Sequence, residues 1–158
     1  WTEGTVLVAV DVGNSSSEHK ALHANLISSA YEVASIAKAT MHIFSAHPSP
    51  MLSASDPTFQ LRETIEARYR EQCVNFVKEL ELEDEPMHIK EGPADILIPE
   101  MAKQLDAVVT VIGTVARTGI SGALIGNTAE VVLDAVETDV LILKPQSVVQ
   151  HLEKQLEK

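Results

Sequence analysis

Cysteine is nearly absent from the sequence: Cys73 is the only one among 158 residues. A single thiol cannot close an internal disulfide, which excludes a disulfide-stapled secreted scaffold and favours a reducing compartment, the cytoplasm. No apolar run reaches the length of about 18 residues that a transmembrane helix requires. The first residues also show neither the basic segment nor the apolar core of a signal peptide.

Basic residues are scarce as well, with 12 Lys and Arg against 23 Asp and Glu, which gives a formal net charge of −11. Because so acidic a surface repels phosphate at long range, we expect no nucleic acid partner. The same charge disfavours binding to an anionic membrane surface. The length suits one domain that can bury a substantial core.

Short apolar runs predict the strands. Residues 6–10, 108–112 and 140–143 are continuously apolar or nearly so, which is typical of strands buried on both faces. Residues 41–44 and 87–89 contain a polar residue between apolar ones, which predicts strands that are half exposed.

Apolar residues at three- and four-residue spacing predict helices between these strands. One stripe lies within residues 22–37, and another lies within residues 59–82, where Cys73 takes an inert packing position. A third helix is expected to begin with Pro93 at its first position, with Pro99 bending or interrupting it.

A fourth helix is expected at Asn127, which with Glu130 has the spacing of a capping-box variant. Strands that alternate with helices imply a parallel sheet. The sequence therefore predicts one doubly wound α/β domain over residues 1–146, with helices on both faces of the sheet. A tail at 147–158 carries an amphipathic stripe, and either packs as a terminal helix on a neighbour or frays.

Glycine is concentrated in one segment, since four of the seven glycines lie between residues 113 and 126. This segment begins where a buried strand ends and finishes where a helix begins, a position at which backbone N–H groups and the helix dipole favour an anion. It contains no acidic residue and one basic residue, Arg117. The segment is either a site for a small anionic ligand or a purely structural loop.

Asp11 lies at the carboxyl end of the first strand. Ligands of doubly wound sheets bind beyond this edge, where the strand order reverses. If the first strand neighbours the fourth, the Asp11 carboxylate faces the glycine segment and can accept hydrogen bonds from a ribose hydroxyl or an adenine amine. The alternative is that Asp11 only caps the turn at Val12 and Gly13.

Catalytic and metal-binding motifs are not evident. His19 and His23 have the spacing of two ligands on one helix, but no third ligand accompanies them, so they are read as surface histidines. The sequence has no nucleophile elbow and no complete P-loop. We therefore expect a binding protein that is not an enzyme and holds no resident metal.

Three stretches together resemble the universal stress protein family: residues 6–11, 113–128 and 139–145. The resemblance covers roughly residues 5–145 and is greatest to the second half of the tandem-domain E type, through Gly-Thr-Val-x-Arg-Thr-Gly-Ile-Ser and Gly-Asn-Thr-Ala-Glu. It implies a Rossmann-like fold with strand order 3-2-1-4-5. It also implies pairing through the fifth strand, from Val140 to Leu143, with a second copy or with the sister domain of a longer protein.

Nucleotide-binding members of the family carry Gly-x-x-Gly, nine residues, then Gly followed by Ser or Thr. This sequence matches at Gly113 and Gly126 and departs at Ala116 and Asn127. A Cβ at residue 116 is costly where the backbone needs a positive φ or touches phosphate. The resemblance implies ATP or AMP, with Mg²⁺, as ligand. The candidate contact positions, with Arg117 as the local cation, are Asp11, Ala46, Ile112, Gly113, Ala116, Arg117, Gly126, Asn127 and Thr128.

Two functions follow from these patterns. The first is a cytoplasmic stress-response domain with a nucleotide-type cleft, which the two departures leave either competent or degenerate. The alternative is an interaction domain that does not bind ATP and pairs with a sister domain or takes another small ligand. An ATP titration of thermal stability separates the two, because a ligand that binds only the native state stabilises it by mass action.

Overall fold

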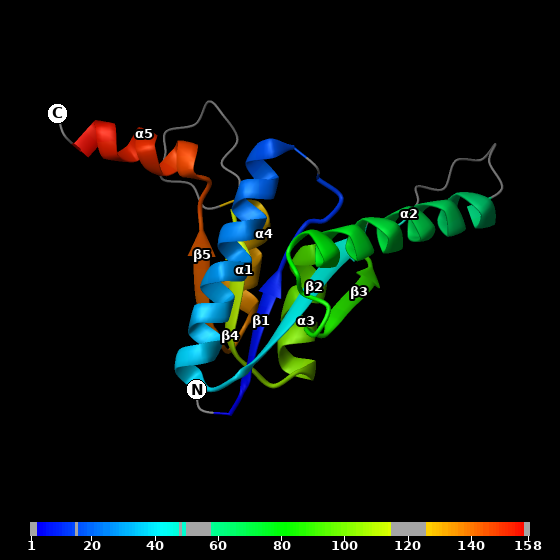
Figure 1. Ribbon diagram of the computed structural model, residues 1–158, viewed down its shortest axis with the longest axis horizontal. Coiled ribbons are helices and arrows are strands. Elements are labelled where there is room, and N and C mark those ends of the chain that lie inside the picture. Colours follow the sequence, from blue (N-terminus) through cyan, green and yellow to red (C-terminus); the bar gives the residue numbers. More distant parts are fainter. Residues whose placement is uncertain (1–2, 15, 48, 50–57, 115–125, 157–158) are drawn as a thin grey trace.

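The structure, a computed structural model, describes residues 3–14, 16–47, 49, 58–114 and 126–156. Its strands and helices alternate along the chain (Figure 1). The strands are β1 (Thr5–Ala9), β2 (Thr40–His47), β3 (Met87–Glu91), β4 (Ala107–Gly113) and β5 (Asp139–Leu143). The helices are α1 (Ser17–Ala37), α2 (Thr58–Glu79), α3 (Ala94–Gln104), α4 (Asn127–Ala135) and α5 (Gln146–Leu156).

The five strands form one parallel sheet in the order β3-β2-β1-β4-β5. This is the order that the family resemblance implies. β1 pairs with β2 on one side and with β4 on the other, so the strand order reverses between β1 and β4. The carboxyl end of β1 therefore lies beside the carboxyl end of β4, which is the condition for bringing Asp11 near the glycine segment.

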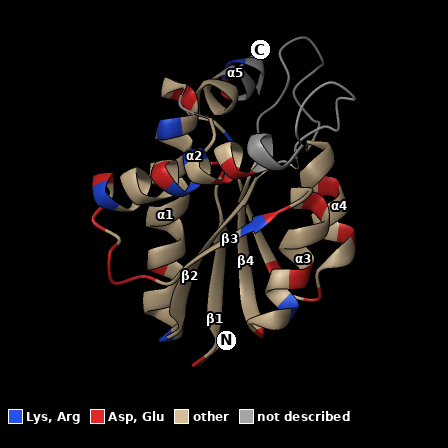
Figure 2. Cartoon of the chain, turned by 90° about the vertical axis from the view of Figure 1, so that its right-hand side faces the viewer, with Lys and Arg blue, Asp and Glu red and all other residues tan. Residues whose placement is uncertain are grey.

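Helices cover both faces of the sheet, and each face has its own core. Figure 2 shows α1 and α2 on one side of the strands and α3 and α4 on the other. Val6 and Val8 of β1 point into the first cluster with α1 and α2, whereas Leu7 points into the second cluster with α3 and α4. All three side chains are fully buried, as expected for a central parallel strand.

The exposure predicted for β2 is wrong, whereas that of β3 is confirmed. Only His42 and Ala46 of the eight β2 residues are half exposed. Thr40 is exposed, and the other five are buried: Met41, Ile43, Phe44, Ser45 and His47. The physical reason is its place in the sheet, since β2 lies between β1 and β3 and is covered by helices on both faces. Every residue of β3, an edge strand, is partly exposed.

The helix boundaries follow local chemistry with two departures from expectation. Ser16 caps α1 by accepting a hydrogen bond from the backbone N–H of His19 at 3.3 Å. Pro93 is the N-cap of α3 and not its first helical residue. α3 also continues through Pro99 without interruption. The carbonyl freed by this proline belongs to Asp95 in the first turn of the helix, where the disturbance is small.

α2 packs its predicted stripe against the first cluster, with Tyr69, Cys73 and Phe76 on the buried side. Burial raises the pKa of the Cys73 thiol to about 11, so the thiol is protonated at neutral pH. A buried thiol in this state is a packing group and a poor nucleophile, as the sequence predicts.

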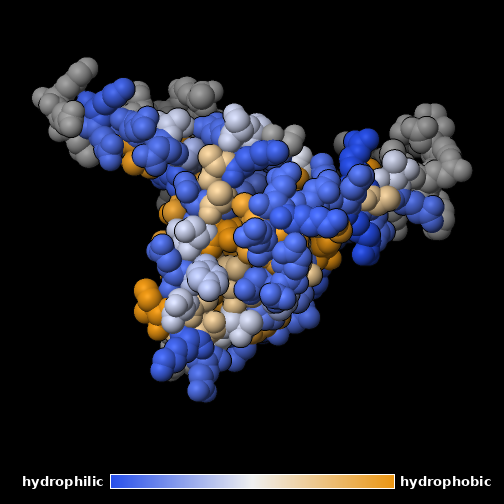
Figure 3. Space-filling view, viewed as in Figure 1, coloured by the Kyte–Doolittle hydropathy of each residue, from blue (hydrophilic) through white to orange (hydrophobic). Residues whose placement is uncertain are grey.

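The tail forms helix α5, which extends away from the body of the domain beyond β5 (Figure 1). Its first turn is tied to α1, because the Ser147 hydroxyl donates a hydrogen bond to a Glu18 carboxylate oxygen at 2.6 Å. Figure 3 shows hydrophilic side chains over α2 and α5 and apolar ones between them, above the sheet. Within the described residues, no helix is both long and apolar enough to cross a bilayer.

Candidate functional site

Asp11 shapes the turn that follows β1. Its carboxylate oxygen Oδ1 accepts a hydrogen bond from the Gly13 N–H at 3.2 Å, and its backbone carbonyl accepts one from the Asn14 N–H at 3.2 Å. The capping role that the sequence suggested is therefore present. Asp11 is nevertheless exposed, so its carboxylate is also accessible from solvent.

Tyr69 of α2 is a second partner of Asp11. Its hydroxyl donates a hydrogen bond to the Asp11 carboxylate, and a Cβ added to Gly13 would collide with this hydroxyl. Burial raises the pKa of Tyr69 to about 12, and the negative charge of Asp11 contributes to the rise. The His47 ring lies against the Tyr69 ring, with 5.2 Å between centroids. Tyr69 thus links α2 to the carboxyl ends of β1 and β2.

His19 and His23 flank the same region from α1 but occupy different environments. Both ring nitrogens of His19 make hydrogen bonds: Nδ1 with Ser16 Oγ at 2.8 Å and Nε2 with Asn14 Nδ2 at 3.1 Å. His23 is buried, contrary to the surface position expected for it, and its ring packs edge-on against Phe76. Among the described residues, no group of three potential ligands is placed to hold a metal ion.

A third histidine contact bridges β2 and β3. His42 Nδ1 and His88 Nε2 are 2.9 Å apart, and the two rings are within 9° of parallel. The ring centroids are 5.2 Å apart, which is about the nitrogen–nitrogen distance plus the radii of the two rings. The two rings therefore lie nearly in one plane and meet edge to edge. One nitrogen must donate and the other accept, which requires that at least one ring be neutral.

The free energy of unfolding is expected to fall as the pH is lowered from about 7.5 to about 5.5. Burial lowers the pKa of His23, against an opposing effect of Asp11, and burial together with His42 and Lys90 lowers the pKa of His88. Below pH 6.5, the ordinary pKa of histidine, these two side chains bind protons more readily in the unfolded chain than in the folded chain. Protonation therefore favours the unfolded chain, and the free energy of unfolding falls. Urea unfolding at several pH values measures this slope.

The double variant His23→Gln, His88→Gln serves as the control for this dependence, because it removes both titrating rings. Its unfolding free energy should vary less with pH over the same interval. An equal slope in the variant and the parent would show that other groups cause the loss.

Thr114 fixes the start of the glycine segment to its end. This residue follows β4, is buried, and accepts a hydrogen bond at Oγ1 from the Gly126 N–H at 2.9 Å. Its own N–H donates to the Leu143 carbonyl at 2.9 Å. Residues 114 and 126 are therefore adjacent in space, so the end of β4 and the beginning of α4 lie together at the carboxyl end of the sheet.

The predicted cap of α4 is wrong by one position. Gly126 is the N-cap, and Asn127 is the first helical residue. No side chain makes a cap hydrogen bond at this end of the described helix, and Asn127 and Thr128 are exposed. The physical reason is that the Gly126 N–H is already bound by Thr114 while its carbonyl accepts from the Glu130 N–H at 3.0 Å, which starts the helix at residue 127.

Thr114→Val should lower the free energy of unfolding by about 1 kcal/mol, because valine keeps the buried shape and leaves the Gly126 N–H without its acceptor. The value lies at the low end of the range because Gly126 is partly exposed. Thr114→Ser, which keeps the hydroxyl, is the matched control. If valine and serine destabilise equally, the hydroxyl does not join the two ends of the segment.

The other predicted contact positions have different surroundings. Ala46 is half buried on β2, and Ile112 is buried in the second core cluster, so its side chain belongs to the core. Gly113 has an independent packing reason, because an added Cβ would lie 3.0 Å from Leu22 Cδ2. Ala116 and Arg117 lie outside the described residues.

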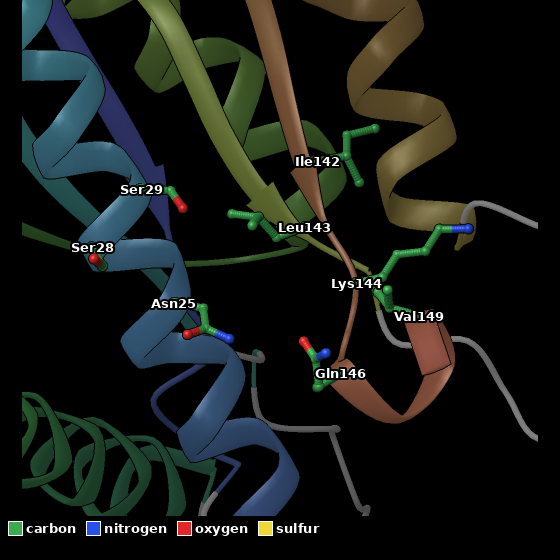
Figure 4. Close-up of a pocket in the computed structure, with 8 residues that line it drawn as sticks. All are labelled: Asn25, Ser28, Ser29, Ile142, Leu143, Lys144, Gln146 and Val149. Atoms are coloured by element: carbon green, nitrogen blue, oxygen red, sulfur yellow. The ribbon is translucent and has the colours of Figure 1, made fainter. Parts of the chain in front are cut away.

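A separate hollow lies between α1, β5 and α5 (Figure 4). Leu143 points towards α1 in this view, whereas Ile142 and Lys144 lie on the other side of β5. The hollow contains none of the predicted nucleotide contacts. Its lining residues are Asn25, Ser28, Ser29, Ile142, Leu143, Lys144, Gln146 and Val149.

Sequence reasoning missed three residues at the candidate site: Tyr69, His47 and Thr114. Tyr69 was assigned only to a packing stripe, and the meeting of α2 with the β1 turn is a tertiary contact that helical spacing cannot reveal. Two signals were available, since His47 lies only three residues after the predicted strand 41–44 and Thr114 directly follows Gly113.

Comparison with known proteins gives a consistent assignment. A sequence model of the universal stress protein family matches residues 4–144. Universal stress protein E of Photorhabdus laumondii is 32% identical over 150 residues, which cover 90% of this chain and 48% of that protein. The chain thus spans about half the length of the curated relatives it matches.

Solved structures agree with this match. A Pseudomonas aeruginosa UCBPP-PA14 structure assigned to the universal stress proteins is 61% identical, has a TM-score of 0.85, and is matched over 100% of this chain and 53% of its own. A universal stress protein solved in complex with cAMP shares the fold, at 22% identity and a TM-score of 0.56 over 90% of this chain and 98% of its own. On the family match over residues 4–144 and the shared fold, the chain belongs to the universal stress protein family.

Proposed function

We propose that this domain binds a small ligand of the adenine nucleotide class at the carboxyl edge of the sheet, between the ends of β1 and β4. The observation that carries the proposal is the parallel pairing of these two strands. It brings an accessible carboxylate, Asp11, to the same edge as the junction of Thr114 with Gly126. An acceptor for nucleoside donors and a helix N-terminus for phosphate then share one edge.

The first turn of α4 supports the phosphate half of this proposal. No described side chain caps this helix end, so the backbone N–H groups of Asn127 and Thr128 in its first turn have no cap from the part of the chain that the structure describes. Such groups and the helix dipole attract an anion. A family member solved with cAMP supports the choice of an adenine nucleotide.

Binding, and not catalysis, is the proposed activity, and the ligands we propose are AMP or ATP, the latter with Mg²⁺. The polar groups around Asp11 hold one another in hydrogen bonds and ring contacts. Ser16 Oγ and His19 Nδ1 are 2.8 Å apart, which is within reach for a nucleophile and its base, but the same hydroxyl accepts the His19 backbone N–H as the cap of α1. We assign this pair to the helix cap. We further propose that the domain acts in a stress response in the cytoplasm, as a module that reports the nucleotide it holds.

Thermal unfolding with AMP, and with ATP and Mg²⁺, tests the function. A ligand at 100 times its Kd should stabilise the native state by about 2.7 kcal/mol. If neither nucleotide stabilises the parent, the variant Ala116→Gly, Asn127→Ser restores the family pattern and should bind. Failure of the parent and of this variant would overturn the proposal.

A second function, pairing through β5, is favoured by one specific observation. Within the described chain β5 pairs only with β4, yet its residues from Val140 to Leu143 are apolar and only partly buried. An apolar edge strand is a liability unless another chain or domain covers it. We propose that a second copy, or the sister domain of a longer protein, pairs there.

Ile142→Asp is expected to shift sedimentation from a dimer to a monomer, because a charge on the paired strand would have to be desolvated at the interface. Ile36→Asp on α1 is the control, since Ile36 is 79% exposed and lies on another element. A dimer that persists in Ile142→Asp would exclude this edge as the interface between two copies.

A further inference from the structure

The Asp11 carboxylate already has two donors inside the protein. Gly13 donates its backbone N–H to Oδ1 at 3.2 Å, and Tyr69 donates its hydroxyl from α2. An ionised carboxylate only accepts hydrogen bonds and has about four lone-pair sites on its two oxygens. A nucleoside that offers donors to Asp11 must therefore either share these oxygens or displace a present donor.

The Gly13 donor is fixed, whereas the Tyr69 donor can be removed without remodelling the turn. The Gly13 N–H and Asp11 belong to the same turn, two residues apart, and the Asn14 N–H closes that turn on the Asp11 carbonyl. Tyr69 comes from another element, and its side chain is only partly buried. A rotation about its side-chain bonds takes the hydroxyl away from Asp11 and leaves the backbone of α2 in place.

The hydroxyl also lies against the backbone of the turn. Because Gly13 has no side chain, the Tyr69 hydroxyl occupies the space where a Cβ would stand, beside Asp11 Oδ1. The His47 ring lies against the Tyr69 ring, at 5.2 Å between centroids and 41° between planes. The Tyr69 side chain thus lies over Asp11, beside the turn and against the His47 ring of β2.

We propose that Tyr69 competes with the ligand for Asp11 and so sets the affinity of the site for the nucleoside part of a nucleotide. This inference rests on the proposed nucleotide function and adds a residue to it. The ligand group that competes is a neutral hydrogen-bond donor, a ribose hydroxyl or an adenine amine, because the ionised carboxylate accepts hydrogen bonds and repels the negative charge of a phosphate.

Competition at Asp11 predicts the AMP affinity of the Tyr69→Phe variant. Removing the hydroxyl in Tyr69→Phe keeps the ring on His47 and frees the Asp11 oxygen. The affinity for AMP should rise roughly tenfold, the equivalent of one hydrogen bond to a charged group. The affinity for inorganic phosphate should stay unchanged. Tyr31→Phe, at an exposed tyrosine of α1, is the matched control and should bind AMP as the parent does.

A double-mutant cycle ties the gain to Asp11. In the Asp11→Asn background the Tyr69→Phe change should no longer raise AMP affinity, because the acceptor that the hydroxyl blocks is no longer a carboxylate. Isothermal titration with AMP gives the four affinities. Circular dichroism of each variant confirms that the compared proteins are folded.

The outcomes separate this inference from the function on which it rests. AMP binding by the parent with equal or weaker binding by Tyr69→Phe would overturn the competition and leave the nucleotide function standing. A gain that persists in Asp11→Asn would also overturn it. If neither the parent nor Tyr69→Phe binds AMP, the inference fails. The proposed function fails with it only if the parent also does not bind ATP and the Ala116→Gly, Asn127→Ser variant binds neither nucleotide. Binding by Tyr69→Phe alone supports both.

Discussion

Alanine at position 11 is expected to weaken AMP binding by roughly 10- to 100-fold, because hydrogen bonds to a charged group contribute about 1.5–3 kcal/mol. The loss follows from the proposed role of the Asp11 carboxylate as acceptor for the nucleoside. Isothermal titration of the folded variant measures it. Asp134→Ala removes an exposed acid from the last turn of α4 and should leave the affinity unchanged.

Asp11→Asn distinguishes the two roles of this residue. Asparagine keeps an oxygen for the Gly13 N–H and so preserves the turn, but it removes the negative charge that strengthens a bond to a ligand donor. AMP affinity should therefore fall in this variant while thermal stability changes little. If Asp11→Ala and Asp11→Asn both bind AMP like the parent, Asp11 is only a turn residue.

Phe44→Ala is expected to lower the free energy of unfolding by about 3–5 kcal/mol, the usual cost of removing a buried aromatic side chain. Phe44 is 1% exposed and lies in the second core cluster with Leu7, Ile98 and Met101. Its strand is paired on both sides, so the surroundings cannot collapse easily into the space. Chemical denaturation measures the change.

The control for Phe44→Ala is Ile36→Ala, a truncation at a side chain that is 79% exposed. This variant should stay within about 0.5 kcal/mol of the parent. A loss below about 1 kcal/mol for Phe44→Ala would contradict the interior position of β2, because a strand on a half-exposed face loses little on truncation.

The positions of the strands could be predicted because they depend on features that a sequence records. Continuous apolar runs marked β1 and β4 as buried strands, and the family resemblance supplied their order. Exposure was harder to predict. The polar residue in the predicted strand 41–44 is His42, whose ring bonds to His88 on the neighbouring strand, and the next polar residue of β2, Ser45, is buried. Polar side chains inside a sheet mimic the pattern of an exposed strand.

The site could be predicted only in part, for reasons that differ from residue to residue. Asp11 was found because it ends a buried strand, a position that chain order defines. Tyr69 was missed because its partner lies 58 residues earlier in the sequence, and no local pattern encodes that contact. The cap of α4 was misplaced by one residue because the hydroxyl that binds Gly126 belongs to Thr114, across the glycine segment.

These observations give one physical account of the domain. A parallel sheet reverses its strand order between β1 and β4 and gathers Asp11, Tyr69 and the start of α4 at one edge. The net charge of −11 disfavours large polyanions, whereas a helix N-terminus beside a carboxylate suits a small nucleotide with both donors and phosphate. The apolar edge of β5 leaves a second surface for a partner domain.

A crystal structure of the protein grown with saturating AMP tests the central claim most directly. The account predicts difference density for one nucleotide at the carboxyl edge of the sheet, with its nucleoside donors on Asp11 and its phosphate at the first turn of α4. It also predicts that the Tyr69 hydroxyl has left Asp11. Density confined to the hollow between α1, β5 and α5, or an empty edge at saturating AMP, would contradict the account.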